Sequence, residues 1–183
     1  MQRNIKMFAF IGLVLIALCI GLLFIPQFAL VRGVTSFENP NLRPISGIEF
    51  FIGKRFGEEN NYLAQNLLGK DAKPHVSAAG IITLILMVFS AASLLTRKYS
   101  SLLSLFGGLF LAVSGILLLL TPLYTLSVYD GKITAYWLAY VLGGILLAYG
   151  AFLTYLGIML LRDEKNALSA PKSHQYSYIN KKK

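Results

Sequence analysis

The sequence predicts an all-α integral membrane protein, a bundle of four transmembrane helices with one long outer loop. Of its 183 residues, 56% are hydrophobic and only 14% are charged, whereas about a quarter of an average soluble domain is charged. The mean hydropathy is +0.63. The charged residues also leave four long apolar runs, each near the length of about 20 residues that a helix needs to cross the hydrocarbon core. These observations exclude an ordinary soluble globule and a disordered chain.

The first predicted span covers residues 7–31, a run without charge that begins after Lys6. A cleaved signal peptide is the alternative, but the run exceeds the usual apolar signal core and no small-x-small cleavage site follows. A lipoprotein signal is also excluded, because it needs a small residue directly before its cysteine and the residue before Cys19 is not small. We therefore expect an uncleaved span, and we expect Pro26 with Gly21 to bend or end its helix near the outer edge.

Three further apolar runs predict the remaining spans, at residues 76–96, 102–121 and 133–161. Pro122 ends the third run and Arg162 ends the fourth. Together with the first run they predict a four-span membrane domain over residues 1–161.

Lysine and arginine predict the orientation of this domain. If both termini are cytoplasmic, more basic residues lie inside than outside, although the outer segments are longer. The inner basic residues are Arg3, Lys6, Arg97, Lys98, Arg162, Lys165, Lys172, Lys181, Lys182 and Lys183. The outer ones are Arg32, Arg43, Lys54, Arg55, Lys70, Lys73 and Lys132. The positive-inside rule therefore predicts a multi-pass protein of the cell membrane with cytoplasmic N- and C-termini.

The first outer loop, residues 32–75, is long enough to carry a function. Within it, residues 46–53 carry apolar side chains at alternate positions, Ile48, Phe50 and Ile52, and a glycine stands on either side of them. This alternation predicts a short strand or an interfacial segment. A weakly helical stretch follows at residues 58–68. The apolar side chains of the first segment either pack as a lid on the span ends or form a surface that binds a partner or substrate. That candidate surface consists of Ile48, Phe50, Phe51 and Ile52.

The polar tail, residues 162–183, is predicted to be cytoplasmic, and its Ser, Asn, Lys and Tyr content predicts disorder. It ends in Lys181, Lys182 and Lys183. These lysines either contact anionic lipid, at about 1 kcal/mol each, or simply complete the topology signal.

Small residues predict how the spans pack. Helices in lipid associate where small side chains permit close approach. In the third and fourth spans such residues recur every seven positions, so we expect these two spans to lie face to face. The glycine seam, as we call these positions, consists of Gly108, Gly115, Gly143, Gly150 and Gly157.

The sequence shows no pattern of residues that would indicate catalysis, a cofactor site or a metal site. No Asp, Glu, Lys, Arg or His falls inside a predicted span, which argues against an ion-coupled carrier. His75 and His174 lie on opposite predicted sides, so they cannot share a metal within one chain. Glu58 and Glu59 form a paired carboxylate, but acidic residues also favour a first helical turn. A membrane enzyme built on this pair is therefore only the third hypothesis.

The layout of cytoplasmic termini, a long first outer loop and a short second one resembles that of claudin-type four-span proteins. That family carries a Trp-Gly-Leu-Trp stretch and two cysteines in its first loop, and residues 32–75 contain neither Trp nor Cys. The resemblance therefore implies the layout alone, and no site residue. Residues 46–53 also resemble a stretch in small four-span bacterial proteins of unassigned function, which implies a fold and no activity.

The leading functional hypothesis is a non-enzymatic accessory or scaffold subunit that acts through helix packing and the first outer loop. Its expected partners are the lipid bilayer and either further copies of itself or another membrane protein, and no nucleic acid. The alternative is an oligomeric channel or small-molecule facilitator. This alternative is based on a row of hydroxyl side chains that would line a path through the membrane. They belong to Thr83, Ser90 and Ser93.

Overall fold

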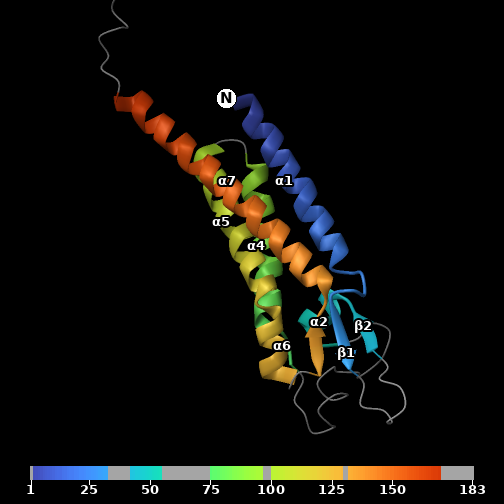
Figure 1. The fold of residues 1–183 in the computed structure, drawn as a ribbon. Helices are drawn as coiled ribbons and strands as arrows, with labels where there is room; N and C mark the ends of the chain where they lie inside the picture. The colour runs from blue at the N-terminus through green and yellow to red at the C-terminus, as the bar shows by residue number, and fades with distance from the viewer. Residues whose placement is uncertain (1, 33–41, 55–74, 97–99, 130–131, 170–183) are drawn as a thin grey trace, which may run out of the picture.

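The computed structural model describes residues 2–32, 42–54, 75–96, 100–129 and 132–169. Long helices form most of the molecule, and a small sheet with a short helix caps one end of them (Figure 1). The N-terminal end of the first helix and the C-terminal end of the last lie at the opposite end from the sheet.

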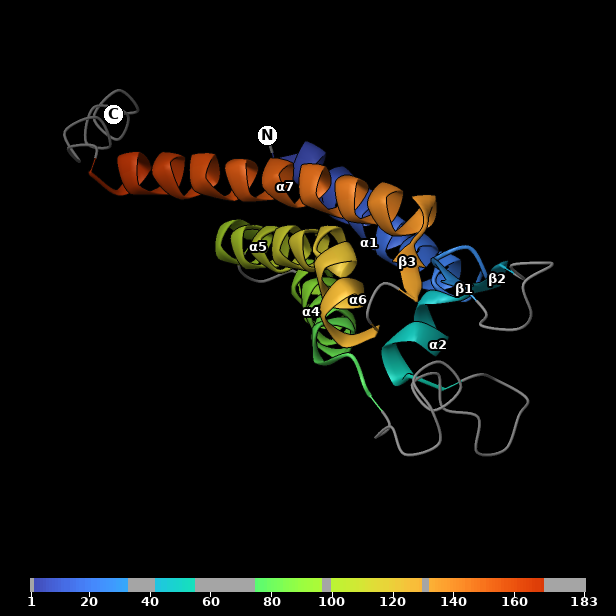
Figure 2. The same cartoon turned by 60° about the horizontal axis from the view of Figure 1, so that its bottom comes forward.

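Three helices are long and apolar enough to cross a membrane, by length and composition. They are α4 (Ala78–Leu95), α5 (Ser100–Leu119) and α7 (Trp137–Ser169). The bounds of α4 and α5 agree with the predicted runs to within two residues. These helices support the prediction of a helical membrane protein. Figure 2 shows α4 beside α5 and α5 beside α7.

The first predicted span, residues 7–31, is wrong over its last nine residues. Helix α1 (Gln2–Leu22) ends where Gly21 and Pro26 were expected to end it, and the chain then turns into strand β1 (Ala29–Arg32). Proline supplies no N–H and cannot continue a helix. The apolar part of α1, Lys6–Leu22, is about 25 Å long at 1.5 Å per residue, shorter than the other three helices.

A three-stranded antiparallel sheet follows α1, and the sequence did not predict it. Strand β1 lies between β2 (Leu42–Ile45) and β3 (Ile133–Ala135). The fourth predicted span began at residue 133, so its first three residues are a strand and its helix starts only at Trp137. The edge strand β2 tolerates Pro44, opposite Leu30, because an edge residue has one side free of the ladder.

The segment predicted to be a short strand or an interfacial segment forms helix α2 (Gly47–Ile52), so the strand prediction is wrong. Ser46 accepts a hydrogen bond from the backbone of Glu49, and Glu49 accepts one from the backbone of Ser46, 3.0 Å away. This capping box starts a helix and overrides the apolar alternation. Gly53 ends α2 at a φ of 71°, where a Cβ would also overlap the His75 carbonyl.

Helix α6 (Thr121–Tyr129) follows α5, with Pro122 in its first turn, a position that proline tolerates. Together α2, α6 and the sheet form what we call the cap. Helix α7 runs to Ser169, so the predicted disorder of the tail is wrong for residues 162–169. The remainder of the tail, with Lys181, Lys182 and Lys183, lies outside the described residues, as do Glu58, Glu59 and the stretch at 58–68.

Candidate functional site

The glycine seam lies at the contact between α5 and α7. A Cβ added to Gly115 would lie 2.6 Å from the Gly143 carbonyl oxygen, and one added to Gly150 would lie 2.7 Å from that of Gly108. A Cβ at Gly157 would lie 2.6 Å from the Leu105 nitrogen. All five seam residues are thus in backbone-to-backbone contact, and any larger side chain would push the two helices apart.

Helix α7 carries a second group of small residues on another face. We call Gly144, Ala148 and Ala151 the open row, since all three are exposed. A Cβ added to Gly144 would meet no atom within 4 Å, in contrast to one on the adjacent Gly143. Within the described residues, nothing covers this face of α7. It therefore has room for the close approach of another helix.

The hydroxyls proposed to line a channel do not form an exposed row. Thr83 and Ser90 are fully buried. Thr83 donates to the Ala79 carbonyl at 2.8 Å, and Ser90 donates to the Gly107 carbonyl of α5 at 2.8 Å. Ser93 bonds within its own helix, to the Phe89 carbonyl. The first two hydroxyls therefore lie inside one bundle, and the Ser90 bond joins α4 to α5.

Most of the candidate surface on the outer loop lies in the hydrophobic core. Ile48, Phe50 and Phe51 are buried, and only Ile52 is exposed, at 41%. A partner cannot reach the three buried side chains without displacing α2. Of the two interpretations of this segment, the lid fits their burial and the partner surface does not.

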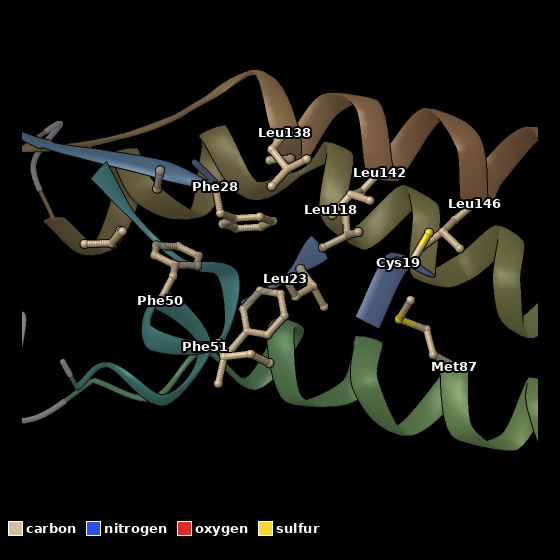
Figure 3. Packing of buried hydrophobic residues seen from close by; sticks show 14 of the residues in the cluster. Cys19, Leu23, Phe28, Phe50, Phe51, Met87, Leu118, Leu138, Leu142 and Leu146 are labelled. Carbon is tan, nitrogen blue, oxygen red and sulfur yellow. The ribbon is translucent and has the colours of Figure 1, made fainter. Parts of the chain in front are cut away.

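An aromatic cluster explains why α2 is buried. Phe28 meets Phe51 edge to face at 5.4 Å between ring centroids, and Phe50 meets Tyr124 edge to face at 5.8 Å. Figure 3 shows Phe28, Phe50 and Phe51 turned toward one another in the same cluster as Leu23. Edge-to-face pairs are the favoured geometry for aromatic rings. This cluster fixes the cap onto the ends of the helices.

Backbone hydrogen bonds also join the cap to α1 and α4. The Ile48 nitrogen donates to the Leu23 carbonyl at 3.2 Å, and the Ser77 nitrogen donates to the Phe51 carbonyl at 2.9 Å. Because α2 is bonded to the end of one long helix and the start of another, it fixes the end of α1 and the start of α4 relative to each other.

Tyr129 is the unusual polar residue of the cap. Its side chain is fully buried, and its hydroxyl has no hydrogen-bond partner among the described residues. Burial, together with a smaller contribution from the nearby Tyr124, raises the pKa of Tyr129 to about 12. The phenol is therefore neutral at any physiological pH.

A cleft of about 610 Å³ opens at the end of the molecule opposite the cap, where it is lined by α1, α4, α5 and α7. Helix α1 contacts α4 and α7, and residues of both α1 and α5 line the cleft. Lys6 and Phe10 come from α1 and Leu156 comes from α7. Ser93 comes from α4, and Thr96 is the C-terminal cap of that helix. No sequence pattern predicted this cleft, because it depends on how far α1 stands from α5.

No group of three or more His, Cys, Asp or Glu that could hold a metal ion occurs in the part of the chain that the structure describes. Of the two histidines, His75 lies beside Gly53 at the end of α2, and His174 lies outside the described residues. The geometry thus offers three features for a function: the open row on α7, the cleft and the cap. No protein-family model and no curated protein matches this chain, so these three features are the basis for a functional assignment.

Proposed function

We propose that this protein is a non-enzymatic, multi-pass membrane protein that serves as an accessory or scaffold subunit and binds a transmembrane helix of a partner protein through the open row on α7. One observation carries the proposal. Helix α7 has two faces of small residues, of which one is packed against α5 and the other is uncovered. Lipid chains gain little from a surface of small residues, whereas a second helix gains close van der Waals contact there.

The packing of α5 against α7 makes this face suitable for a scaffold. Backbone contact at the glycine seam leaves α7 little freedom to rotate, and the buried Ser104 hydroxyl adds a bond to the Leu153 carbonyl at 3.3 Å. A helix that is held in this way presents its other face without a further loss of entropy on binding. Pre-organisation of that kind raises affinity.

We further propose that α1 is the fourth membrane crossing and that both termini are cytoplasmic. Phe24 and Ile25, which follow the last turn of α1, are exposed, so the apolar surface continues beyond the helix itself. A short helix is accommodated by local thinning of the bilayer. In support of the topology, the N-terminal end of α1 and the C-terminal end of α7 lie opposite the cap (Figure 1), at the end to which the positive-inside rule assigns the cytoplasm.

The test is the composition of the complex purified in native lipid discs. We expect a stoichiometric second protein with the wild type and its loss with Gly144→Leu, because leucine prevents close approach at the open row. Ala92→Leu is the matched control, since Ala92 is exposed on α4. Retention of the second protein by Gly144→Leu, or a homo-oligomer with no second protein, would overturn the proposal. Substrate turnover by the purified chain alone would also overturn it.

A further inference from the structure

We propose that the cleft opposite the cap binds one acyl chain of an anionic phospholipid from the surrounding bilayer, with the lipid phosphate beside Lys6. This proposal requires only that the helices lie in a membrane. It is independent of the accessory role and of the open row on α7.

The size and lining of the cleft fit an acyl chain. Its volume of about 610 Å³ lies within the range of ligand sites. Most of the lining side chains are apolar, among them Leu13, Leu94, Leu103 and Leu153. Protein interiors are otherwise close-packed, and an apolar void holds water poorly. Within a bilayer, a lipid chain is the apolar molecule available to fill such a space.

The cleft is also open to lipid from the side. Phe10 of α1 and Leu95 of α4 line it and are each 65% exposed. In a membrane these exposed faces contact lipid directly, so a chain enters without crossing water. The walls of the cleft are continuous with the lipid-facing surface of the bundle.

The helices that form the walls are held in position by contacts between α1 and its neighbours α4 and α7. Tyr149 donates to the Phe8 carbonyl at 2.6 Å, and Phe8 meets Phe152 edge to face at 5.2 Å. A Cβ on Gly12 would lie 2.9 Å from the Leu94 side chain, so α1 and α4 already touch at this level. The position of α1 is therefore set by contacts with α4 and α7, and it leaves the space beside α5 unfilled.

The charge at the cleft selects the headgroup. Of the described residues that line the cleft, Lys6 alone carries a charge, and it is exposed near the start of α1. The hydroxyls of Ser93 and Thr96 donate to carbonyls of their own helix, so they are not free to donate to a phosphate. An ammonium group at the end of an apolar cleft favours a lipid with a net negative headgroup over a zwitterionic one.

The experiment is native mass spectrometry of the full chain during titration with dioleoyl-phosphatidylglycerol or dioleoyl-phosphatidylcholine. We expect the wild type to retain one phosphatidylglycerol more strongly than phosphatidylcholine. Lys6→Gln should lower the affinity for phosphatidylglycerol about fivefold and leave that for phosphatidylcholine unchanged. Lys165→Gln is the matched control, because Lys165 is an exposed base on α7 that does not line the cleft. It should bind as the wild type does.

A second variant tests the acyl-chain part of the site. Ala9 lines the cleft, so Ala9→Phe should fill it and abolish retention of both lipids. Ala92→Phe places the same ring on the exposed face of α4 and should have no effect. If Ala9→Phe does not fold by circular dichroism, Ser93→Phe serves instead, since Ser93 also lines the cleft. Unchanged lipid retention in the folded variant, or equal affinity of the wild type for both lipids, would overturn the proposal.

Discussion

The hydroxyl of Tyr149 on α7 donates a hydrogen bond of 2.6 Å to the backbone carbonyl of Phe8 on α1. This bond links two helices that are far apart in the sequence, and few other polar contacts within the described residues join α1 to the bundle. Because Phe8 and its neighbour Ala9 line the cleft, the same bond also sets the position of one cleft wall.

Tyr149→Phe should loosen α1 without unfolding the bundle. The substitution removes one hydrogen bond, worth about 1 kcal/mol, and keeps the ring that contacts Phe152. We expect faster amide hydrogen exchange over residues 6–16 and little change in α5 and α7. Tyr155→Phe is the control, because Tyr155 is 60% exposed on the same helix. Equal exchange in α1 of both variants would show that the bond does not hold α1 in place.

Gly150→Ile should destabilise the bundle strongly. A Cβ at this position already overlaps Ala112 of α5, and three further carbons would force the two helices apart. Overpacking of a tight contact costs about 1–3 kcal/mol or more. The measurement is the midpoint of thermal unfolding in mild detergent. Gly144→Ile is the matched control, because its Cβ meets no atom within 4 Å, and it should unfold close to the wild type. Similar midpoints for the two variants would disprove the packing role of the seam.

The long helices were predictable because their signal is local. An apolar run of sufficient length between charged residues defines α4 and α5, and small residues at a spacing of seven identify the faces that meet. The glycine seam follows from sequence spacing alone. The face of α7 that remains open was harder to identify, because Gly143 and Gly144 are adjacent in the sequence and only the structure distinguishes the packed residue from the exposed one.

The cap was not predictable, because it depends on pairing between distant segments. Strand β3 consists of three residues next to a long apolar run, and its partner β1 lies about a hundred residues earlier. No periodicity can develop over three residues. The capping box at Ser46 and Glu49 was visible in the sequence as Ser-x-x-Glu, and it would have predicted the start of α2. The cleft depends on the distance between α1 and α5, for which the sequence holds no signal.

Ser46→Ala should fray the start of α2. The Ser46 hydroxyl accepts a hydrogen bond from the Glu49 nitrogen at 3.3 Å, and loss of such a cap costs about 1 kcal/mol. We expect faster amide exchange over residues 47–52 and a lower unfolding midpoint. Ser127→Ala serves as the control, because that hydroxyl is exposed and bonds only within α6, to the Tyr124 carbonyl. If exchange in α2 stays slow in Ser46→Ala, the aromatic cluster alone is sufficient to hold the helix.

Tyr129→Phe should stabilise the protein at neutral pH. The buried hydroxyl of Tyr129 has no hydrogen-bond partner among the described residues, and an unsatisfied buried polar group costs about 1–3 kcal/mol. Phenylalanine keeps the ring and its contact with Phe50. The midpoint of thermal unfolding should therefore rise. Tyr136→Phe is the comparison, since Tyr136 is exposed at the end of β3 and should leave the midpoint unchanged. A lower midpoint in Tyr129→Phe would mean that the hydroxyl is satisfied in the membrane-bound protein.

Tyr129 should also make the stability of the cap fall at high pH. Burial raises the pKa of Tyr129 to about 12 from its ordinary value of 10.0, because the folded protein excludes the phenolate. Above pH 10 the unfolded chain releases this proton while the folded protein retains it, so the free energy of unfolding falls by about 1.4 kcal/mol per pH unit until the folded pKa is reached. Below pH 10 both states are protonated and the contribution is constant. The measurement is the unfolding midpoint of wild type and Tyr129→Phe between pH 9 and pH 12. The gap between the two should widen with pH, and a gap that stays constant over this range would contradict the buried neutral phenol.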